Sequence, residues 1–273
     1  MAGYEDAVNG PLTVETILTS GVDVVCLQEC NEGWEQLLMN ALSETGTTGG
    51  DDDELRSVYP YTYFRHDQWT YGGRAVLSKY PLVGEPEWLP KVFPWWYGAM
   101  LVKVLVKPAT RDGATDDGAN GDGVVVPILN VHLRAPFPSN PFKVQRQRLY
   151  EIRTHLRLVE QLNSKRDSND ENTNMTDSHG GLPARLIILG DFNTRWGQCH
   201  QYLQNDRGFV SALSEQRQGW TVFDYTWHFK HVVTNLMDHI YFRPNEYRLT
   251  DCAIWKNKGG SDHFPLVANL QIL

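Results

Sequence analysis

Short apolar segments rich in β-branched and aromatic residues recur along the whole chain, and their spacing restricts the fold more than any other feature. Each segment is bounded by Gly, Pro, Asp or Asn, which is the pattern of short strands ended by turns. A chain with many such segments folds around packed sheets rather than as a helical bundle. The nine predicted strands are Val22–Leu27, Tyr59–Arg65, Arg74–Ser78, Ala99–Val106, Val124–Leu133, Arg185–Leu189, Met237–Phe242, Tyr247–Trp255 and Pro265–Ile272.

Helices are fewer and lie between the predicted strands. The sequence predicts helices at Thr13–Thr19 and Glu32–Leu42, and a long helix from about Phe142 to Leu162. Apolar residues recur at helical spacing along one side of the long helix, with acids and bases on the other side. Short strands interspersed with helices favour two packed sheets flanked by helices over one parallel sheet. We therefore expect an α/β fold.

Three polar segments interrupt this pattern, at 43–56, 108–123 and 163–181. They consist mostly of Gly, Ser, Thr, Asn and Asp, which cannot bury apolar surface, so we expect solvated loops. Because they fall between periodic segments and do not separate two cores, residues 1–273 are expected to form a single domain.

The negative charge of the chain is concentrated in polar stretches. The net charge is −8, and residues 51–54, 111–122 and 167–177 together carry −11, which leaves +3 on the rest. That balance is compatible with a phosphate-bearing substrate. It includes no run of Lys and Arg of the kind that marks a nucleic-acid-binding surface.

Several classes of protein are excluded by what the sequence lacks. No apolar run approaches the roughly 18 residues of a membrane-spanning helix, and no signal peptide is visible at the N-terminus. The cysteines form no C-x-x-C pair and are too few for a disulfide scaffold. We expect a monomeric intracellular protein, cytoplasmic or nuclear, with reduced thiols at Cys26, Cys30, Cys199 and Cys252.

Polar residues at the ends of apolar strands mark the candidate site. Four segments share this design: 24–29 ends in Glu29, 128–133 contains His132, 186–193 ends in Asp-x-Asn, and 259–266 contains an Asp-His pair. Taken singly, each is compatible with an ordinary helix cap, turn or surface ion pair. Taken together, carboxylates, amides and imidazoles at strand ends are what a divalent-cation phosphoesterase needs, because oxygen ligands suit Mg²⁺ and imidazoles stabilise charge on phosphorus oxygens.

Six motifs, in this order, resemble the endonuclease/exonuclease/phosphatase superfamily. They are LQE at 27–29, GGRAVLSKYPL at 72–82, NVHL at 130–133, GDFN at 190–193, TW at 226–227 with MDHIYF at 237–242, and SDHFPLVANL at 261–270. The resemblance covers nearly the whole chain. It implies a four-layer α/β/β/α sandwich and a phosphoester hydrolase that depends on Mg²⁺ or Mn²⁺.

The resemblance also implies a role for each matching residue. Glu29 is the main metal ligand, and Asp262 is similar to a second carboxylate on the metal side. Asp191 positions or deprotonates the attacking water, with help from Asn193. The residues implied to act on the scissile phosphate are His263, oriented by Asp238, and His132, which matches members that use a second histidine.

One expected element of the family is missing from the sequence. The family opens with a strand that carries an Asn upstream of the LQE strand, and here only 26 residues precede Leu27. The earlier Asn9 lies in a context that reads as a turn. We therefore expect the fold without its first family strand, as in a truncated chain. The alternative function is a catalytically impaired homologue that binds phosphate ligands.

The remaining candidate residues concern the substrate. We expect a phosphoester as the substrate, and nucleic acid is one of the classes considered. Trp95 and Trp96 are candidates for stacking on a base or ring, with core packing as the alternative. Arg134 and Arg195 are candidates for a phosphate clamp, with a salt bridge as the alternative. His228 and His231 have no partner at zinc-ligand spacing, so we do not assign a metal to them. DNA, RNA, lipid and inositol phosphate all remain open as substrates, because this fold serves many.

Overall fold

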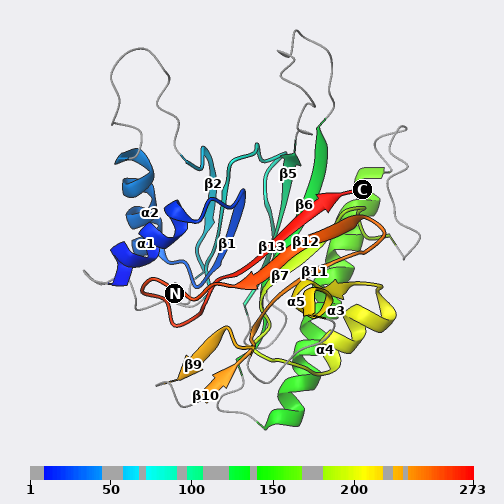
Figure 1. Cartoon of the computed structure of the whole chain (residues 1–273). Coiled ribbons are helices and arrows are strands. Elements are labelled where there is room, and N and C mark those ends of the chain that lie inside the picture. The colour runs from blue at the N-terminus through cyan, green and yellow to red at the C-terminus, as the bar shows by residue number, and fades with distance from the viewer. Residues whose placement is uncertain are drawn as a thin grey trace.

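The computed structural model describes residues 9–44, 58–67, 72–90, 97–106, 123–135, 140–167, 181–217, 224–229 and 233–273 (Figure 1). Predicted segments outside these ranges, including most of the three polar segments and both Trp95 and Trp96, are not described. No helix within the described ranges is both long and apolar enough to cross a membrane.

A six-stranded sheet forms the centre of the molecule. The sheet consists, in spatial order, of β4 (Glu87–Leu89), β5 (Ala99–Val106), β6 (Val124–His132), β7 (Ile187–Asp191), β11 (Asp238–Phe242) and β8 (Val210–Ser211). In this sheet only β6 and β7 run parallel, and the other neighbours are antiparallel.

A second layer of strands packs against one face of this sheet. It contains a three-stranded sheet in the order β1 (Val24–Gln28), β3 (Arg74–Ser78) and β2 (Tyr61–Arg65), and a pair formed by β12 (Tyr247–Ile254) and β13 (Leu266–Ile272). Aliphatic side chains from both layers, such as Val76, Val102 and Ile128, form the core between them. Alternating β-branched residues favour this arrangement, since each strand offers one apolar face to the interior.

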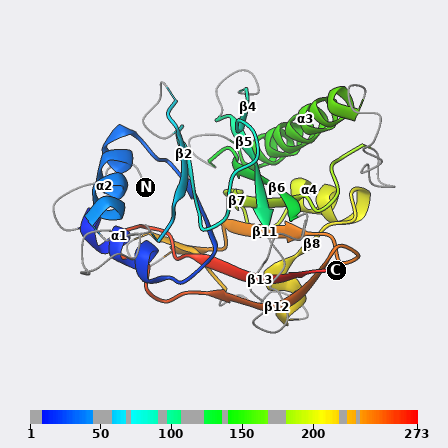
Figure 2. The ribbon, with the colours of Figure 1, turned by 90° about the horizontal axis from the view of Figure 1, so that it is seen from above.

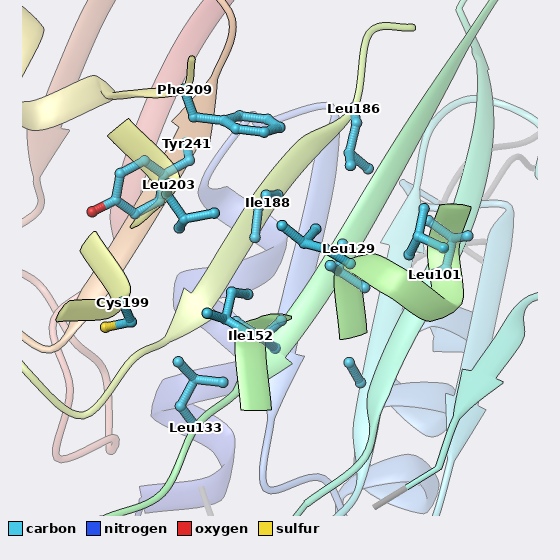
Figure 3. Packing of buried hydrophobic residues seen from close by; sticks show 14 of the residues in the cluster. Leu101, Leu129, Leu133, Ile152, Leu186, Ile188, Cys199, Leu203, Phe209 and Tyr241 are labelled. Carbon is cyan, nitrogen blue, oxygen red and sulfur yellow. The ribbon is translucent and has the colours of Figure 1, made fainter. Parts of the chain in front are cut away.

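Helices cover the two outer faces. The helices α1 (Asn9–Thr19) and α2 (Glu32–Glu44) pack on the three-stranded sheet, and their shared core includes Trp34 and Leu38. On the far face of the central sheet lie α3 (Pro141–Asp167), α4 (Gln198–Gln201) and a π-helical turn (Tyr202–Asp206). Ile152 of α3 packs there with Leu129 and Ile188 (Figure 3). The helices thus enclose the strands from both sides (Figure 2), which confirms the predicted α/β/β/α fold.

The predicted strands all occur, with bounds shifted by at most two residues. The structure adds short elements that the sequence pattern did not reveal, because two to six residues are too few to show a period. These are β4, β8, α4, the π-helical turn, α5 (Ala212–Arg217) and the hairpin of β9 (Trp227–Phe229) and β10 (Val233–Asn235).

Two predictions about the chain near its helices were wrong. Asn9 begins α1 and is not in a turn; Pro11 is tolerated there because the first helical turn needs no N–H at that position. The helices α2 and α3 continue to Glu44 and Asp167, so the first residues of the predicted loops at 43–56 and 163–181 are helical. The last residues of both helices are polar, so the spacing of apolar residues does not reveal where they end. The first strand within the described ranges is β1, which contains Leu27 and Gln28 of the LQE motif and is followed directly by Glu29.

Candidate functional site

Three side chains lie in one row across the central sheet. The ladders align His132 of β6 with Asp191 of β7, and Asp191 with Asp238 of β11. The row lies at one end of the strands, where β6 and β7 end and the antiparallel β11 begins. Matched register places the three side chains on the same face of the sheet. His132 Nε2 is 3.4 Å from Asp191 Oδ2.

Asn193 fixes the carboxylate of Asp191. Its backbone N–H donates to Asp191 Oδ1 at 2.6 Å, and its side-chain Nδ2 donates to Asp191 Oδ2 at 3.0 Å. Nδ2 also donates to the carbonyl oxygen of Leu133 at 2.9 Å. Asn193 has a φ of 54°, a left-handed conformation that Asn tolerates better than most residues. Burial, and then the nearby Asp238 carboxylate, raises the pKa of Asp191.

His263 and Asp238 form a hydrogen-bonded pair beside this row. His263 Nδ1 is 2.7 Å from Asp238 Oδ2, and the loop that carries His263 is joined to Trp227 by a β-bridge. Burial is the largest single influence on the pKa of His263 and lowers it. The charge and hydrogen bond of Asp238, together with the charges of Asp191 and Asp262, outweigh burial and raise that pKa to about 10. The ring is therefore a cation held by a carboxylate at neutral pH.

Glu29 reaches the same region from the outer sheet layer. It follows β1 with a φ of 58°, and its Oε1 lies 3.8 Å from His132 Nε2. The end of β1 is tied to the central sheet by the buried Asn130, which accepts from Gln28 Nε2 at 2.8 Å and donates to the Leu27 carbonyl at 3.1 Å. The structure thus brings together the four strand-end segments identified from the sequence, although they come from distant parts of the chain.

The remaining candidates with described side chains are Arg134 and Arg195 for the substrate and Asp262 for the metal, and each has a hydrogen-bond partner within the protein. Arg134 is buried, with Nη1 donating to Gln147 Oε1 at 2.7 Å and its backbone N–H donating to Glu151 Oε2. Arg195 is also buried and donates to the carbonyl oxygen of Asp224. Asp262 Oδ2 accepts from the indole N–H of Trp227 at 3.3 Å. Trp95 and Trp96 lie outside the described residues.

Oxygen donors are present, but they do not form a preassembled metal cage. In the part of the chain that the structure describes, no group of three or more His, Cys, Asp or Glu side chains could by itself hold a metal ion. Glu29 and Asp262 line the same cavity and supply carboxylate oxygens, and one or two carboxylates are enough to hold Mg²⁺ when waters and substrate phosphate oxygens complete its coordination.

Thr226 supports the His263–Asp238 pair and was not identified from the sequence as a site residue. Its fully buried Oγ1 accepts from the backbone N–H groups of Met237 and Asp238, both at 3.0 Å. Its carbonyl accepts from Phe264 N at 2.6 Å. Thr226 therefore joins the start of β11 to the loop that carries His263. The signal was available, since Thr226 is the first residue of the TW motif.

Two buried histidines support the loop after β7. His200 Nε2 and His239 Nε2 lie 3.1 Å and 2.9 Å from the carbonyl oxygen of Thr194. His200 Nδ1 contacts the hydroxyl of Tyr241 at 2.5 Å. Burial lowers the pKa of His239 to about 4, so the ring is neutral and Nε2 can donate. No sequence motif distinguishes these histidines from catalytic ones.

The sequence model described as "Endonuclease/Exonuclease/phosphatase family" matches residues 8–263. No curated protein matches the sequence.

Several solved structures share the fold. D. rerio TDP2 complexed with a single-strand DNA product is 15% identical, with a TM-score of 0.58 over 99% of this chain and 96% of that one. The human Nocturnin catalytic domain with bound sulfate is 14% identical, with a TM-score of 0.61 over 97% and 86%. ANGEL2, a 2′,3′-cyclic phosphatase in complex with adenosine-2′,3′-vanadate, is 12% identical, with a TM-score of 0.58 over 97% of this chain and 86% of that one.

Proposed function

Because the chain belongs to the endonuclease/exonuclease/phosphatase family, whose members hydrolyse phosphoester substrates, we propose that it hydrolyses a phosphoester bond with the help of a divalent metal ion. The observation that carries this proposal is the row of His132, Asp191 and Asp238, with His263 hydrogen bonded to Asp238. This arrangement places a base on the rigid central sheet and a cationic donor on the loop beside it, which favours in-line attack of water on phosphorus.

Asp191 is the residue we assign to the attacking water. Two hydrogen bonds from Asn193 hold its carboxylate in one orientation, and β7 holds its backbone. A carboxylate that is fixed in this way accepts the proton of a water molecule at a defined position relative to the phosphate. Asn193 is accordingly a positioning residue for Asp191.

His263 is the residue we assign to the charge that develops on the phosphate. Its Nδ1 is engaged by Asp238, which leaves Nε2 as the ring nitrogen that can donate to a phosphate oxygen. Asp238 keeps the ring protonated and oriented. His132 stacks on Tyr97, with ring centroids 4.4 Å apart, and serves as a second imidazole beside Asp191.

Glu29 and Asp262 are the carboxylates we assign to the metal ion, Mg²⁺ or Mn²⁺. Their oxygen donors suit a hard cation, and the side chain of Glu29 is 27% exposed, so it is accessible at the site. Such an ion, when bound, neutralises charge on the phosphate oxygens. Arg134, Arg195, Trp95 and Trp96 are the proposed substrate contacts.

A panel of phosphoesters tests this proposal. Nucleic acid is the first class to test, because one structurally similar protein was crystallised with a single-strand DNA product. The panel contains single-stranded DNA, RNA, 5′-tyrosyl DNA, sphingomyelin and an inositol phosphate, each with Mg²⁺, Mn²⁺ or excess chelator. We expect hydrolysis of at least one member that chelation abolishes. Full activity in chelator contradicts the metal assignment. Tight binding without hydrolysis supports the alternative of an impaired binding homologue.

A further inference from the structure

The outer face of α3 carries a stripe of exposed basic and aromatic side chains, here called the α3 stripe. Ile152 and Val159 lie on the other side of the helix, where they are buried against the central sheet. The stripe residues follow one another at spacings that place them within an arc of about 100° and along about 22 Å of the helix. The α3 stripe consists of Phe142, Lys143, Arg146, Tyr150, Arg153 and Arg157.

The α3 stripe holds four basic side chains and no acidic one. Between 141 and 159 the only acid is Glu151, which is buried on the inner side of the helix. The next acid, Glu160, is paired with Arg207. Arg153 Nη2 lies 3.9 Å from Asp206 Oδ2, but both side chains are about half exposed, so this ion pair is weak. The stripe is therefore a concentration of positive charge on a chain whose net charge is −8.

Helix stability does not explain where these charges lie. The positive end of the helix dipole is at the N-terminus and favours acids there, yet the first turn of α3 contains no acid, and Lys143 and Arg146 follow its start. Like charges three or four residues apart also repel each other, as Lys143 does Arg146 and Arg153 does Arg157. An anionic ligand on this face would offset both unfavourable effects.

Aromatic rings alternate with these charges. The side chains of Phe142 and Tyr150 are 82% and 59% exposed. At the same end of the helix, Gln145 Nε2 donates to the carbonyl oxygen of Trp196 at 3.2 Å, and Trp196 is itself 67% exposed. Exposed rings of this kind offer flat surfaces on which nucleobases can stack. Trp196 belongs to the loop that follows Asn193, so this end of the α3 stripe adjoins the candidate site.

We propose that the α3 stripe is an accessory surface that binds single-stranded nucleic acid. Its basic side chains contact phosphates and its rings stack on bases, a combination that suits strands bound without sequence preference. DNA and RNA share this chemistry, so both should bind. An anionic membrane fits less well, because the apolar side of α3 is buried in the core and cannot insert into lipid. The proposal goes beyond the proposed hydrolysis and does not depend on it.

Binding measured without turnover tests the proposal. The probes are fluorescein-labelled oligo-dT and oligo-U of about 20 nucleotides, which exceeds the length of a typical single-strand site. Fluorescence anisotropy of the full chain is measured in excess chelator, so that no metal-dependent reaction contributes. We expect saturable binding of both probes. The logarithm of the binding constant should fall with the logarithm of the salt concentration at a slope of about −3, because each of the four phosphate contacts contributes about −0.7.

Two charge reversals locate the binding surface. Arg146→Glu alters the α3 stripe, and Arg248→Glu makes the same change at an exposed position of β12, on the opposite side of the molecule (Figure 2). We expect only Arg146→Glu to weaken binding, by about tenfold, and to make the salt slope shallower by at least about 0.7. Its melting temperature should stay the same or rise, because an acid suits the N-terminal part of a helix.

Removal of a ring tests the aromatic part separately. Tyr150→Ala should weaken binding about tenfold and leave the salt slope unchanged, because it removes stacking and no charge. The salt slope of the unaltered protein decides the matter even if a variant does not fold. The proposal would be overturned by no binding up to about 1 mM, by a slope shallower than about −1, by equal losses from the two charge reversals, or by binding to phosphatidylserine vesicles without binding to either oligonucleotide.

Discussion

The hydroxyl of Thr226 offers a stability test of how the site is held together. Thr226→Val keeps the shape of the side chain and removes the oxygen that accepts from two backbone N–H groups, those of Met237 and Asp238. The first N–H is buried and the second is partly buried. A buried donor without a partner costs about 1–3 kcal/mol. The loss of the shared acceptor of both N–H groups should therefore reduce the free energy of unfolding by about 2–4 kcal/mol.

The matched control for this change is Thr226→Ser, which keeps the hydroxyl and loses one methyl group. The loss should be about 1 kcal/mol or less, because a buried methyl contributes about 0.8 kcal/mol. Urea unfolding of the three proteins measures the difference. The reasoning is refuted if Thr226→Val lies within about 0.5 kcal/mol of the wild type, or if Thr226→Ser is as damaging as Thr226→Val.

Two further predictions concern pH and backbone packing. Burial, and then Arg74, lowers the pKa of His155 to about 3, whereas an unfolded histidine titrates near 6.5. The unfolded chain therefore binds more protons below pH 6.5, and the stability that neutral His155 contributes is present above that pH and lost as the pH falls toward 3. Between pH 7 and 5 the wild type should lose about 2 kcal/mol more than His155→Gln in urea unfolding, and equal losses would contradict this. Gly190 has a φ of 131°, and a Cβ there would lie 2.0 Å from the Val131 carbonyl oxygen, so Gly190→Ala should destabilise by about 3 kcal/mol or more. Gly84→Ala, which meets no atom within 4 Å, should cost only about 1 kcal/mol, and a similar loss for both would show that the clash is relieved.

Strand periodicity predicted two packed sheets flanked by helices, and the strand-end segments singled out Asp191 and His263 before their contacts were known. The place of Asp238 beside them was implied by the family resemblance. The ladder register then explains why these residues meet, because strands with matching ends meet at one edge of a sheet. The supporting residues could not be predicted in the same way. His200 and His239 stabilise a carbonyl through tertiary contacts, and nothing in their local sequence distinguishes them from catalytic histidines.

The separation of β1 from β13 depends on arrangement rather than on local pattern. The sequence did not show that, among the described residues, these two strands would line the same cavity without pairing with each other. Periodicity predicts which segments become strands and does not predict which strands pair across distant parts of a chain.

The most direct test of the central claim is the turnover number of His263→Ala on whichever phosphoester of the panel the wild type hydrolyses. The account predicts that kcat falls by about 10²–10⁴-fold, more than KM changes, while the melting temperature stays close to that of the wild type. Asp238→Asn should show a smaller loss, because it misorients the ring without removing it. Unchanged turnover by His263→Ala would contradict the account, because the row of side chains beside Asp191 would then not be the catalytic site.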